Sequence, residues 1–453
     1  MAGVNEKKRD KEKQVDRRSF LRMTTAAGAG LVLAPKSIAR VRMGNSNDLN
    51  IALLGVGAQG QILLNACLKT SGIRFKAVCD IWEAYNLKRA SGLLRKYGHN
   101  VGEYVDYREM LDKENDLDAV IIATPDFWHA DQTVHCLRAG LHVYCEKEMS
   151  KTVDGARRMV QTARQTGRHL QIGHQRRSNP RYLHCYHKLI KEARILGKIT
   201  TISGQWNRSA QPDLGWPKKA AIDQATLERY GYESMHEFRN WRWYRHLGGG
   251  PVVDLGSHQI DIFNWFLETP PRSVLASGGN YYYDTKTHQW DDTVMVIYEY
   301  EPNQGAVKAF YQTINSNSSE GYYEHFMGDQ GTLLISEAAG REGIYREPSS
   351  PDWTKWIERG YLKAPVEEKE TVQTGAIIDV RETMAPPEHK LAVDFNEPYH
   401  KPHLENFFDA IRGRANLNCP EDVGYETAVT VLKIHEALDA GMKVEFNPDD
   451  FKI

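Results

Sequence analysis

A glycine-rich turn near residue 55 restricts the fold of this chain more than any other feature. An apolar run at residues 50–55 leads into Gly55-Val56-Gly57-Ala58-Gln59-Gly60, and residues 58–70 are predicted to form a helix. A G-x-G-x-x-G between a buried strand and a helix is typical of a Rossmann-type dinucleotide site. Gly55 permits the tight turn, Gly57 lets the backbone approach the pyrophosphate, and Gly60 lets the helix pack on the strand. The helix start at Ala58 and Gln59 offers free N–H groups to the phosphates.

The second strand, predicted at residues 75–80, ends in an acidic residue that indicates which dinucleotide binds. Asp80 lies about 20 residues beyond the glycines, where a carboxylate bonds the ribose hydroxyls. A carboxylate there would repel a 2′-phosphate, and the next residues, Ile81-Trp82-Glu83, include no arginine. We therefore expect NAD rather than NADP. The alternative is a glycine-rich turn beside an unrelated surface aspartate.

The order of predicted elements separates two folded parts. Residues 48–175 alternate strands with helices, which indicates a parallel sheet with right-handed crossovers. Residues 176–453 contain strands of alternating polarity, typical of an antiparallel sheet with one open face. The expected fold class is α/β: an N-terminal Rossmann domain followed by an α+β domain with a mostly antiparallel open sheet. Further strands are predicted at 119–124, 142–146, 169–173, 199–206, 272–278, 293–300, 307–312, 325–328 and 332–336, and helices at 82–97, 129–139, 152–166, 252–267, 403–412 and 421–440. Residues 207–247 and 340–400 show no clear pattern.

The first 45 residues differ from the rest and resemble an export signal. A basic, polar stretch precedes Arg17-Arg18-Ser19-Phe20-Leu21-Arg22, and an uncharged run from Met23 to Pro35 follows. That run is shorter than the ~20 residues of a membrane-spanning helix. We expect residues 1–45 to be a twin-arginine signal and linker, so that the protein is periplasmic or otherwise exported, with no stable membrane insertion afterwards. A disordered basic tail beside a short helix is the alternative.

Charge and cysteine content restrict the partners. The net charge is −1, so no overall field recruits nucleic acid or an anionic membrane. The six cysteines are scattered and form no C-x-x-C pair. We therefore expect no metal site and no disulfide framework.

Four motifs together resemble the Gfo/Idh/MocA oxidoreductases, the glucose-fructose oxidoreductase and inositol dehydrogenase family. They are the glycine turn, Ala123-Thr124-Pro125 with His129, Glu146-Lys147, and Asp254-x-Gly256-x-His258-x-x-Asp261. The segment His403-Leu404-Glu405-Asn406-Phe407 is also similar. The resemblance covers residues from about 48 to 445 and implies the two-part fold above, with an open sheet that often forms oligomer contacts. One departure is Glu148, which stands where the family has a proline that is often part of a cis peptide, and this leaves the local turn in question.

The resemblance implies a catalytic set of Lys147, Asp254 and His258. Lys147 would orient the substrate hydroxyl and stabilise its developing negative charge. Asp254 and His258 are four residues apart, so a helix would place them on one face. His258 could then take the hydroxyl proton, while Asp254 holds the histidine or the substrate. The alternatives are a surface lysine, and a helix-capping aspartate with a core histidine.

The remaining candidates contact the cofactor or the substrate. His129 either contacts the dinucleotide or fixes its loop, and the Trp-Arg-rich run at residues 241–245 suits either sugar stacking or a packed interface. The implied cofactor contacts are Thr124, Pro125, His129, Glu146 and Gln175, and the implied substrate contacts are Arg177, Arg242, Trp243 and Asp261.

These residues leave three functions open. The first is an NAD-dependent oxidoreductase acting on a hydroxyl of a sugar or glycoside. The second is an NAD-dependent glycosidase that works by transient oxidation, elimination and re-reduction, like the α-N-acetylgalactosaminidases; Lys147 argues against it, because that branch lacks this lysine. The third is a non-catalytic sensor. An exported enzyme would have to retain and recycle its cofactor, so we expect tightly bound NAD, and we expect a homo-oligomer.

Overall fold

The computed structural model describes residues 48–338, 340–365 and 388–453. The predicted export segment at residues 1–45 lies outside the described residues, as does part of the 340–400 region. No helix in the described part of the chain is long and apolar enough to cross a membrane.

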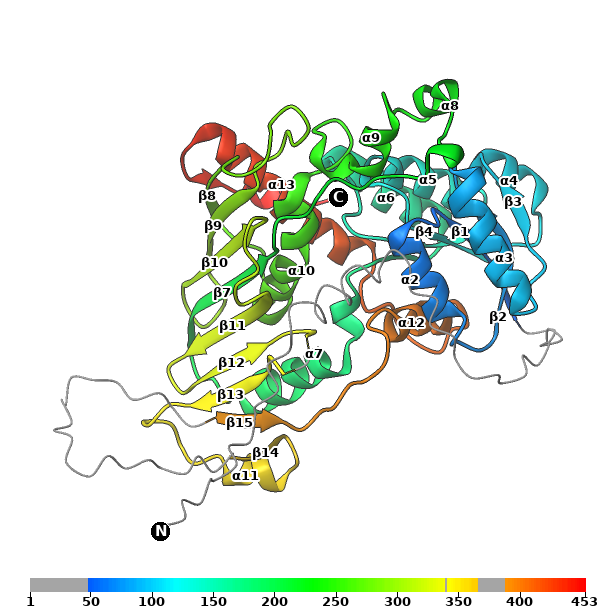
Figure 1. Ribbon diagram of the computed structural model, residues 1–453. Helices are drawn as coiled ribbons and strands as arrows, with labels where there is room; N and C mark the ends of the chain where they lie inside the picture. The colour runs from blue at the N-terminus through cyan, green and yellow to red at the C-terminus, as the bar shows by residue number, and fades with distance from the viewer. Residues whose placement is uncertain (1–47, 339, 366–387) are drawn as a thin grey trace, which may run out of the picture. The chain divides into compact units, whose positions relative to one another are not determined.

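The first sheet has six strands in the order β3-β2-β1-β4-β5-β6 (Figure 1). All neighbours are parallel. The central strands are continuous apolar runs with both faces covered, which is why Ile51, Leu53 and Ile121 are fully buried. The strands are β1 Leu49–Leu54, β2 Ile73–Cys79, β3 Gly102–Tyr104, β4 Ala119–Ile122, β5 His142–Cys145 and β6 Leu170–Ile172.

The crossover helices follow the prediction with one addition. They are α2 Ala58–Cys67, α3 Lys88–Lys96 after a π-turn at Glu83–Leu87, α4 Tyr107–Lys113, α5 Asp126–Arg138 and α6 Val153–Thr166. The sequence patterns predict no element between residues 98 and 118, where the structure has β3 and α4. Both are too short to produce a recognisable hydrophobic period.

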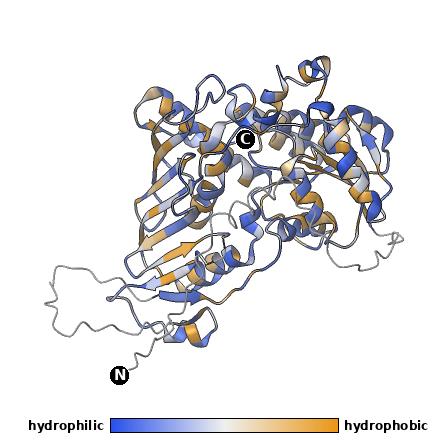
Figure 2. Cartoon of the chain, in the orientation of Figure 1, coloured by the Kyte–Doolittle hydropathy of each residue, from blue (hydrophilic) through white to orange (hydrophobic). Residues whose placement is uncertain are grey.

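The second sheet has ten strands in the order β14-β15-β13-β12-β11-β7-β10-β9-β8-β16, and it is antiparallel except for the β7–β10 pair. Polarity alternates along its strands (Figure 2), and helices α10 Gly250–Leu267 and α13 Glu421–Ala440 pack against it. The predicted fold class is therefore confirmed. The strands are β7 Ile199–Asn207, β8 Ser273–Gly279, β9 Thr293–Tyr300, β10 Val307–Ile314, β11 Tyr322–Gly328, β12 Gly331–Ile335, β13 Gly343–Arg346, β14 Leu362–Pro365, β15 Glu388–Leu391 and β16 Val444–Glu445.

Two segments of the second half pack on the first sheet. Helix α12, Lys401–Ile411, places Leu404 and Phe407 in one apolar cluster with Ile51. Helix α12 therefore packs on the first sheet, although in the sequence it lies far beyond residue 175, the predicted end of the first domain. The second segment is residues 207–247, which contain α8 Gln224–Arg229, α9 Met235–Arg239 and a 3-10 turn at Trp241–Trp243. Its aromatic side chains cluster on Trp82, next to the end of β2.

Shorter elements complete the described fold. Between β6 and β7 lie a 3-10 helix at Gln175–Ser178, helix α7 Pro180–His184 and a π-helix at Cys185–Ala193. Helix α11, Thr354–Glu358, precedes β14.

Candidate active site

The glycine turn has the geometry that a dinucleotide requires. Gly55 has a φ of +79°, and a Cβ at Gly60 would collide with the carbonyl oxygen of Gly55. A Cβ at Gly57 would occupy open space, with only the Asn86 amide at 3.8 Å. No side chain caps the start of α2, at Ala58 and Gln59, so its N–H groups face that space. These residues fit the pyrophosphate of a dinucleotide.

Asp80 lines the cavity beside this turn, together with Thr124 and Pro125. Its carboxylate accepts hydrogen bonds from the backbone N–H of Val56 at 2.9 Å and of Trp82 at 2.7 Å. Burial raises the pKa of Asp80, but these two N–H groups lower it and hold the carboxylate in place. A fixed acidic group at this position suits the ribose hydroxyls.

The opposite wall of the cofactor cavity comes from residues 207–247. Tyr230, Tyr232 and Phe238 line the cavity opposite the glycines. Phe238 packs edge-on against Trp82 at 5.7 Å, and the Arg239 guanidinium lies 5.1 Å above the same ring. The sequence analysis did not assign these residues to the cofactor; the only signal for them was the aromatic richness of the segment.

His129 fixes the cofactor loop and does not line the cavity. Its ring is buried, and its two nitrogens lie 2.7 Å from the carbonyl oxygens of Thr124 and Glu148. Of the two roles considered for His129, the geometry supports loop anchoring. The Lys147–Glu148 peptide beside it is cis although no proline is present.

A second cavity of about 440 Å³ brings most of the predicted site residues together. Lys147 lies after β5, and Asp254 and His258 lie one turn apart near the start of α10. The predicted residues that line this cavity are Gln59, Glu146, Lys147, Gln175, Arg242, Trp243, Asp254 and His258. The catalytic candidates and three of the cofactor candidates therefore share one space.

Asp254 binds two of the cationic side chains of this cavity, Lys147 and Arg242. The Lys147 Nζ donates to the Asp254 carbonyl at 2.6 Å and to its Oδ1 at 2.9 Å, and the Arg242 Nε donates to Oδ2 at 3.1 Å. Burial alone would raise the pKa of Asp254, but Lys147, Arg242 and Arg208 bring it well below its usual value. Asp254 is therefore ionised and positions Lys147 rather than His258.

His258 is held as a neutral imidazole. Burial, followed by the charge of Lys147, lowers its pKa well below the usual value. Its Nδ1 has no hydrogen-bond partner among the described residues, and its ring lies 5.2 Å from that of Trp206. A neutral imidazole in the cavity can accept a proton at neutral pH.

Arg177 and Asp261, which were predicted to contact the substrate, face each other in the interior instead. Arg177 and Asp261 form a buried ion pair, with Nε–Oδ1 at 2.9 Å and Nη2–Oδ1 at 2.8 Å. Thr427 also donates to Asp261, at 2.9 Å. Neither residue lines either of the two cavities described above. Each charge is paired with the other, and this pairing offsets the high cost of burying a charge at this position.

The cavity also contains residues that the sequence analysis missed. They come from strand ends, from connecting loops and from the segment before α12, so no local motif marks them. They include Trp206, Arg208, Asp213, Tyr283, His288, Tyr322, Glu337, Tyr399 and His400. His400 Nε2 lies 2.9 Å from the Gln59 amide, and thus connects the α12 segment with the glycine turn.

Two family descriptions match most of the chain. Residues 49–174 match the oxidoreductase family, NAD-binding Rossmann fold, and residues 188–446 match the C-terminal alpha/beta domain of the same family. The chain belongs to the Gfo/Idh/MocA oxidoreductase family. The predicted family, the NAD cofactor and the oxidoreductase class are thereby confirmed.

The relatives that the chain matches differ in how much of it they cover. The chain is 25% identical over 305 residues to inositol 2-dehydrogenase of Rubrobacter xylanophilus, covering 66% of this chain and 74% of that protein. It is 31% identical over 174 residues to glycosyl hydrolase family 109 protein 2 of Shewanella sp. strain ANA-3, covering 34% of this chain and 38% of that protein.

Solved dehydrogenase structures share the fold. The WlbA dehydrogenase from Bordetella pertussis, in complex with NADH and UDP-GlcNAcA, superposes with a TM-score of 0.62 at 17% identity, covering 89% of this chain and all of that chain. Levoglucosan dehydrogenase, in complex with NADH and levoglucosan, gives a TM-score of 0.64 at 17% identity, covering 88% and 99%.

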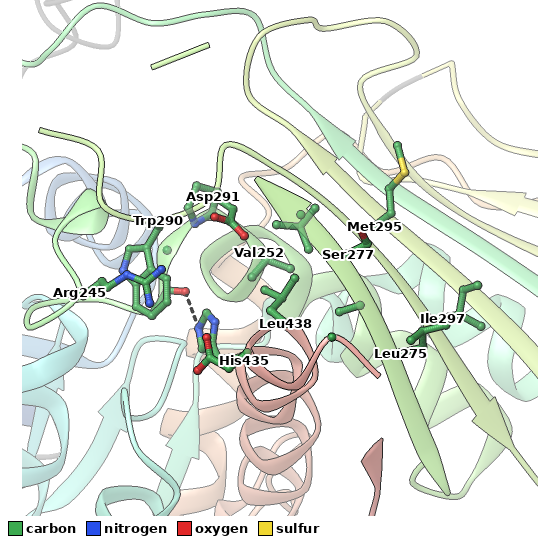
Figure 3. A pocket seen from close by; sticks show the side chains of 18 of the residues that line it. Arg245, Val252, Leu275, Ser277, Trp290, Asp291, Met295, Ile297, His435 and Leu438 are labelled. Atoms are coloured by element: carbon green, nitrogen blue, oxygen red, sulfur yellow. Dashed lines mark hydrogen bonds between the residues drawn. The ribbon is translucent and has the colours of Figure 1, made fainter. Parts of the chain in front are cut away.

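A separate hollow of about 610 Å³ lies where strands β8 to β10 meet the ends of α10 and α13 (Figure 3). Trp290 stacks on His435 at 4.2 Å, and His435 bonds the Gly249 carbonyl at 2.9 Å. Exposed Met295 and Ile297 line its wall. Lys147, Asp254 and His258, the predicted catalytic residues, do not line this hollow.

Proposed function

We propose that this protein oxidises a hydroxyl group of a sugar or glycoside with NAD, or carries out the reverse reduction. The observation that carries this proposal is that ion-paired Lys147 and neutral His258 share one cavity with Gln59 and Glu146. A charged donor and a neutral acceptor in one cavity are what removal of a hydroxyl proton requires.

Each side chain has a defined task in this proposal. Lys147 donates to the substrate oxygen and stabilises its negative charge. His258 accepts the hydroxyl proton, while Asp254 holds Lys147 in place. The bound nicotinamide supplies the hydride acceptor.

A carbohydrate substrate agrees with the cavity lining and with the relatives. Trp243 and Tyr283 line the cavity, and aromatic side chains suit contact with the apolar faces of sugar rings. Relatives named for inositol and levoglucosan oxidation support the same class.

We further propose that NAD is held tightly. Tyr230, Tyr232 and Phe238 cover the cofactor cavity from the second half of the chain, so release requires this aromatic wall to open. A twin-arginine export signal at residues 1–45, which we also propose, would make retention necessary. The exposed Met295 and Ile297, on the open sheet, support a homo-oligomer.

The glycosidase alternative draws support from the match to a family 109 glycosyl hydrolase. That match spans 38% of the relative, and it therefore leaves most of that protein uncompared. Lys147, paired with Asp254, favours the dehydrogenase.

One experiment separates the two functions. The purified full chain is denatured to measure released dinucleotide, and the native protein is incubated with sugars and aryl glycosides while nicotinamide reduction and aglycone release are followed together. We expect close to one NAD per chain, and a keto sugar formed in step with nicotinamide reduction. Aglycone release without net reduction would replace this proposal by the glycosidase, and protein free of dinucleotide would refute tight binding.

A further inference from the structure

Arg208 is a cation of the substrate cavity that no motif identifies. It directly follows β7, and its backbone N–H donates to the Ile314 carbonyl at 2.7 Å. Its guanidinium lies 5.2 Å above the Trp206 ring and lines the cavity. Because Trp206 also stacks on Tyr322 at 4.5 Å, the platform beneath the guanidinium is itself fixed.

The guanidinium of Arg208 has no acidic partner among the described residues. No hydrogen bond or ion pair of this side chain occurs within that part of the chain, whereas Lys147 and Arg242 both bind Asp254. Burial lowers the pKa of Arg208, and the more distant charge of Asp254 offsets only part of this effect. Five N–H donors in a partly desolvated cavity without an acceptor are unfavourable unless a ligand supplies one.

The carboxylates that line the cavity are engaged elsewhere. Asp213 lies 2.7 Å from His236, and Glu337 accepts a hydrogen bond from Arg176 at 2.9 Å. Asp254 is shared by two cations, and burial raises the pKa of Glu146. Asp254 attracts Arg208 across the cavity, but no carboxylate of the described residues forms a hydrogen bond or ion pair with it.

We propose that Arg208 binds a carboxylate of the substrate, so that the substrate is a sugar acid or uronide. The inference rests on the proposed function, because it places the substrate in the same cavity. A guanidinium is a planar fork that matches a carboxylate with two parallel hydrogen bonds. One uncompensated positive charge also matches a carboxylate monoanion better than a phosphate dianion.

The test uses the full-length protein with its bound dinucleotide. Methyl glycosides of glucuronic, galacturonic and mannuronic acid are compared with their neutral parent sugars and with the 6-phosphates. Single-turnover reduction of the bound nicotinamide gives the half-saturating concentration and the limiting rate, and calorimetric titration measures binding independently. Variants are Arg208→Gln and Arg208→Lys, with the exposed Arg414→Gln as the matched control.

We expect one uronide to be preferred over its neutral parent. Arg208→Gln should raise its half-saturating concentration about 10- to 100-fold, because a hydrogen bond to a charged group is lost, and should change that of the neutral sugar far less. Arg208→Lys should restore much of the preference, and Arg414→Gln should match the wild type.

Three results would overturn the inference: equal use of neutral and acidic sugars by the wild type, an equal effect of Arg208→Gln on both, or a preference for the phosphate. Failure of the proposed function appears differently. If no sugar reduces the bound nicotinamide, yet a uronide binds the wild type and not Arg208→Gln by calorimetry, then the redox proposal falls and the carboxylate site stands.

Discussion

Two charge clusters lie close to Trp206, and they differ in how their charges are compensated. The open cluster is Lys147, Asp254 and Arg242; its Lys147 and Asp254 side chains are each 11% exposed and line the substrate cavity. The closed cluster is Arg176, Glu324 and Glu337, where Arg176 is 1% exposed and Glu324 is fully buried. The guanidinium of Arg176 lies 5.6 Å from the Trp206 ring, and Tyr182 donates to Glu324 at 2.7 Å.

The two clusters differ in whether a member keeps a hydrogen-bond donor that a ligand could use. In the closed cluster one cation bonds two buried carboxylates, and Tyr182 donates to one of them, so both acids have partners within the protein, although Glu337 also lines the substrate cavity. In the open cluster Lys147 uses two of its three N–H donors on Asp254, which leaves one for a ligand. We infer that the closed cluster contributes to stability and the open cluster to chemistry.

The largest effect should come from the closed cluster. Arg176→Met leaves Glu324 and Glu337 buried without their cation, and we expect a loss of about 3–5 kcal/mol in the free energy of unfolding. Urea denaturation measures it, with the exposed, ion-paired Arg158→Met as a control expected to cost about 0–1 kcal/mol.

Glu324→Gln provides a second check on this cluster. Added to Arg176→Met, it should recover part of the lost stability. Burial raises the pKa of Glu324 to about 7, which shows that a charge at this position is costly, and glutamine carries no charge. Equal costs for Arg176→Met and Arg158→Met would contradict a structural role for the closed cluster.

A substitution in the open cluster should affect the reaction rate much more than the free energy of unfolding. Lys147→Ala removes the donor to the reacting oxygen, and we expect the single-turnover rate to fall about 10²- to 10³-fold. Asp254 keeps its bond to Arg242, so the unfolding free energy should change far less than in Arg176→Met. Lys188→Ala, a lysine ion-paired to Glu192 on the surface, is the matched control. A rate within a few-fold of the wild type would remove Lys147 from the catalytic set.

The two clusters also differ in how well the sequence predicted them. Lys147, Asp254 and His258 lie in short motifs whose spacing is fixed by one strand end and one helix turn, so their convergence could be predicted. The same holds for the glycine turn and Asp80. The closed cluster joins residues about 150 positions apart, and no local period connects them.

The site residues that the sequence misplaced or missed also depend on contacts between segments distant in the chain. Arg177 and Asp261 lie in or near motifs, yet their side chains face each other in the interior. Arg208 and the aromatic wall at residues 230–238 reach the cavities only through tertiary packing of strand ends and a segment without a clear pattern. The fold was more predictable because hydrophobic periodicity and the strand–turn–helix order are local signals.

Glu148 follows Lys147 in the chain but bonds no cation among the described residues. It is buried, its Oε1 accepts the Met149 N–H at 2.8 Å, and its Oε2 has no partner among the described residues. Burial raises the pKa of Glu148 to about 8. Between the usual pKa of a glutamate and pH 8 the folded protein therefore keeps a proton that the unfolded chain releases.

This proton makes stability fall as pH rises, by at most about 1.4 kcal/mol per pH unit. Glu148→Gln removes the titration, so its unfolding free energy should depend less steeply on pH from about pH 5 to pH 8 and should exceed that of the wild type at the upper end. Asp126 and Glu324, whose pKa values burial raises to about 7, keep part of the slope in both proteins. Urea unfolding across this range measures the effect, with the exposed Glu228→Gln as control. Parallel curves for the wild type and Glu148→Gln would mean that Glu148 is ionised in the folded protein, and that Lys147 compensates it as well as Asp254.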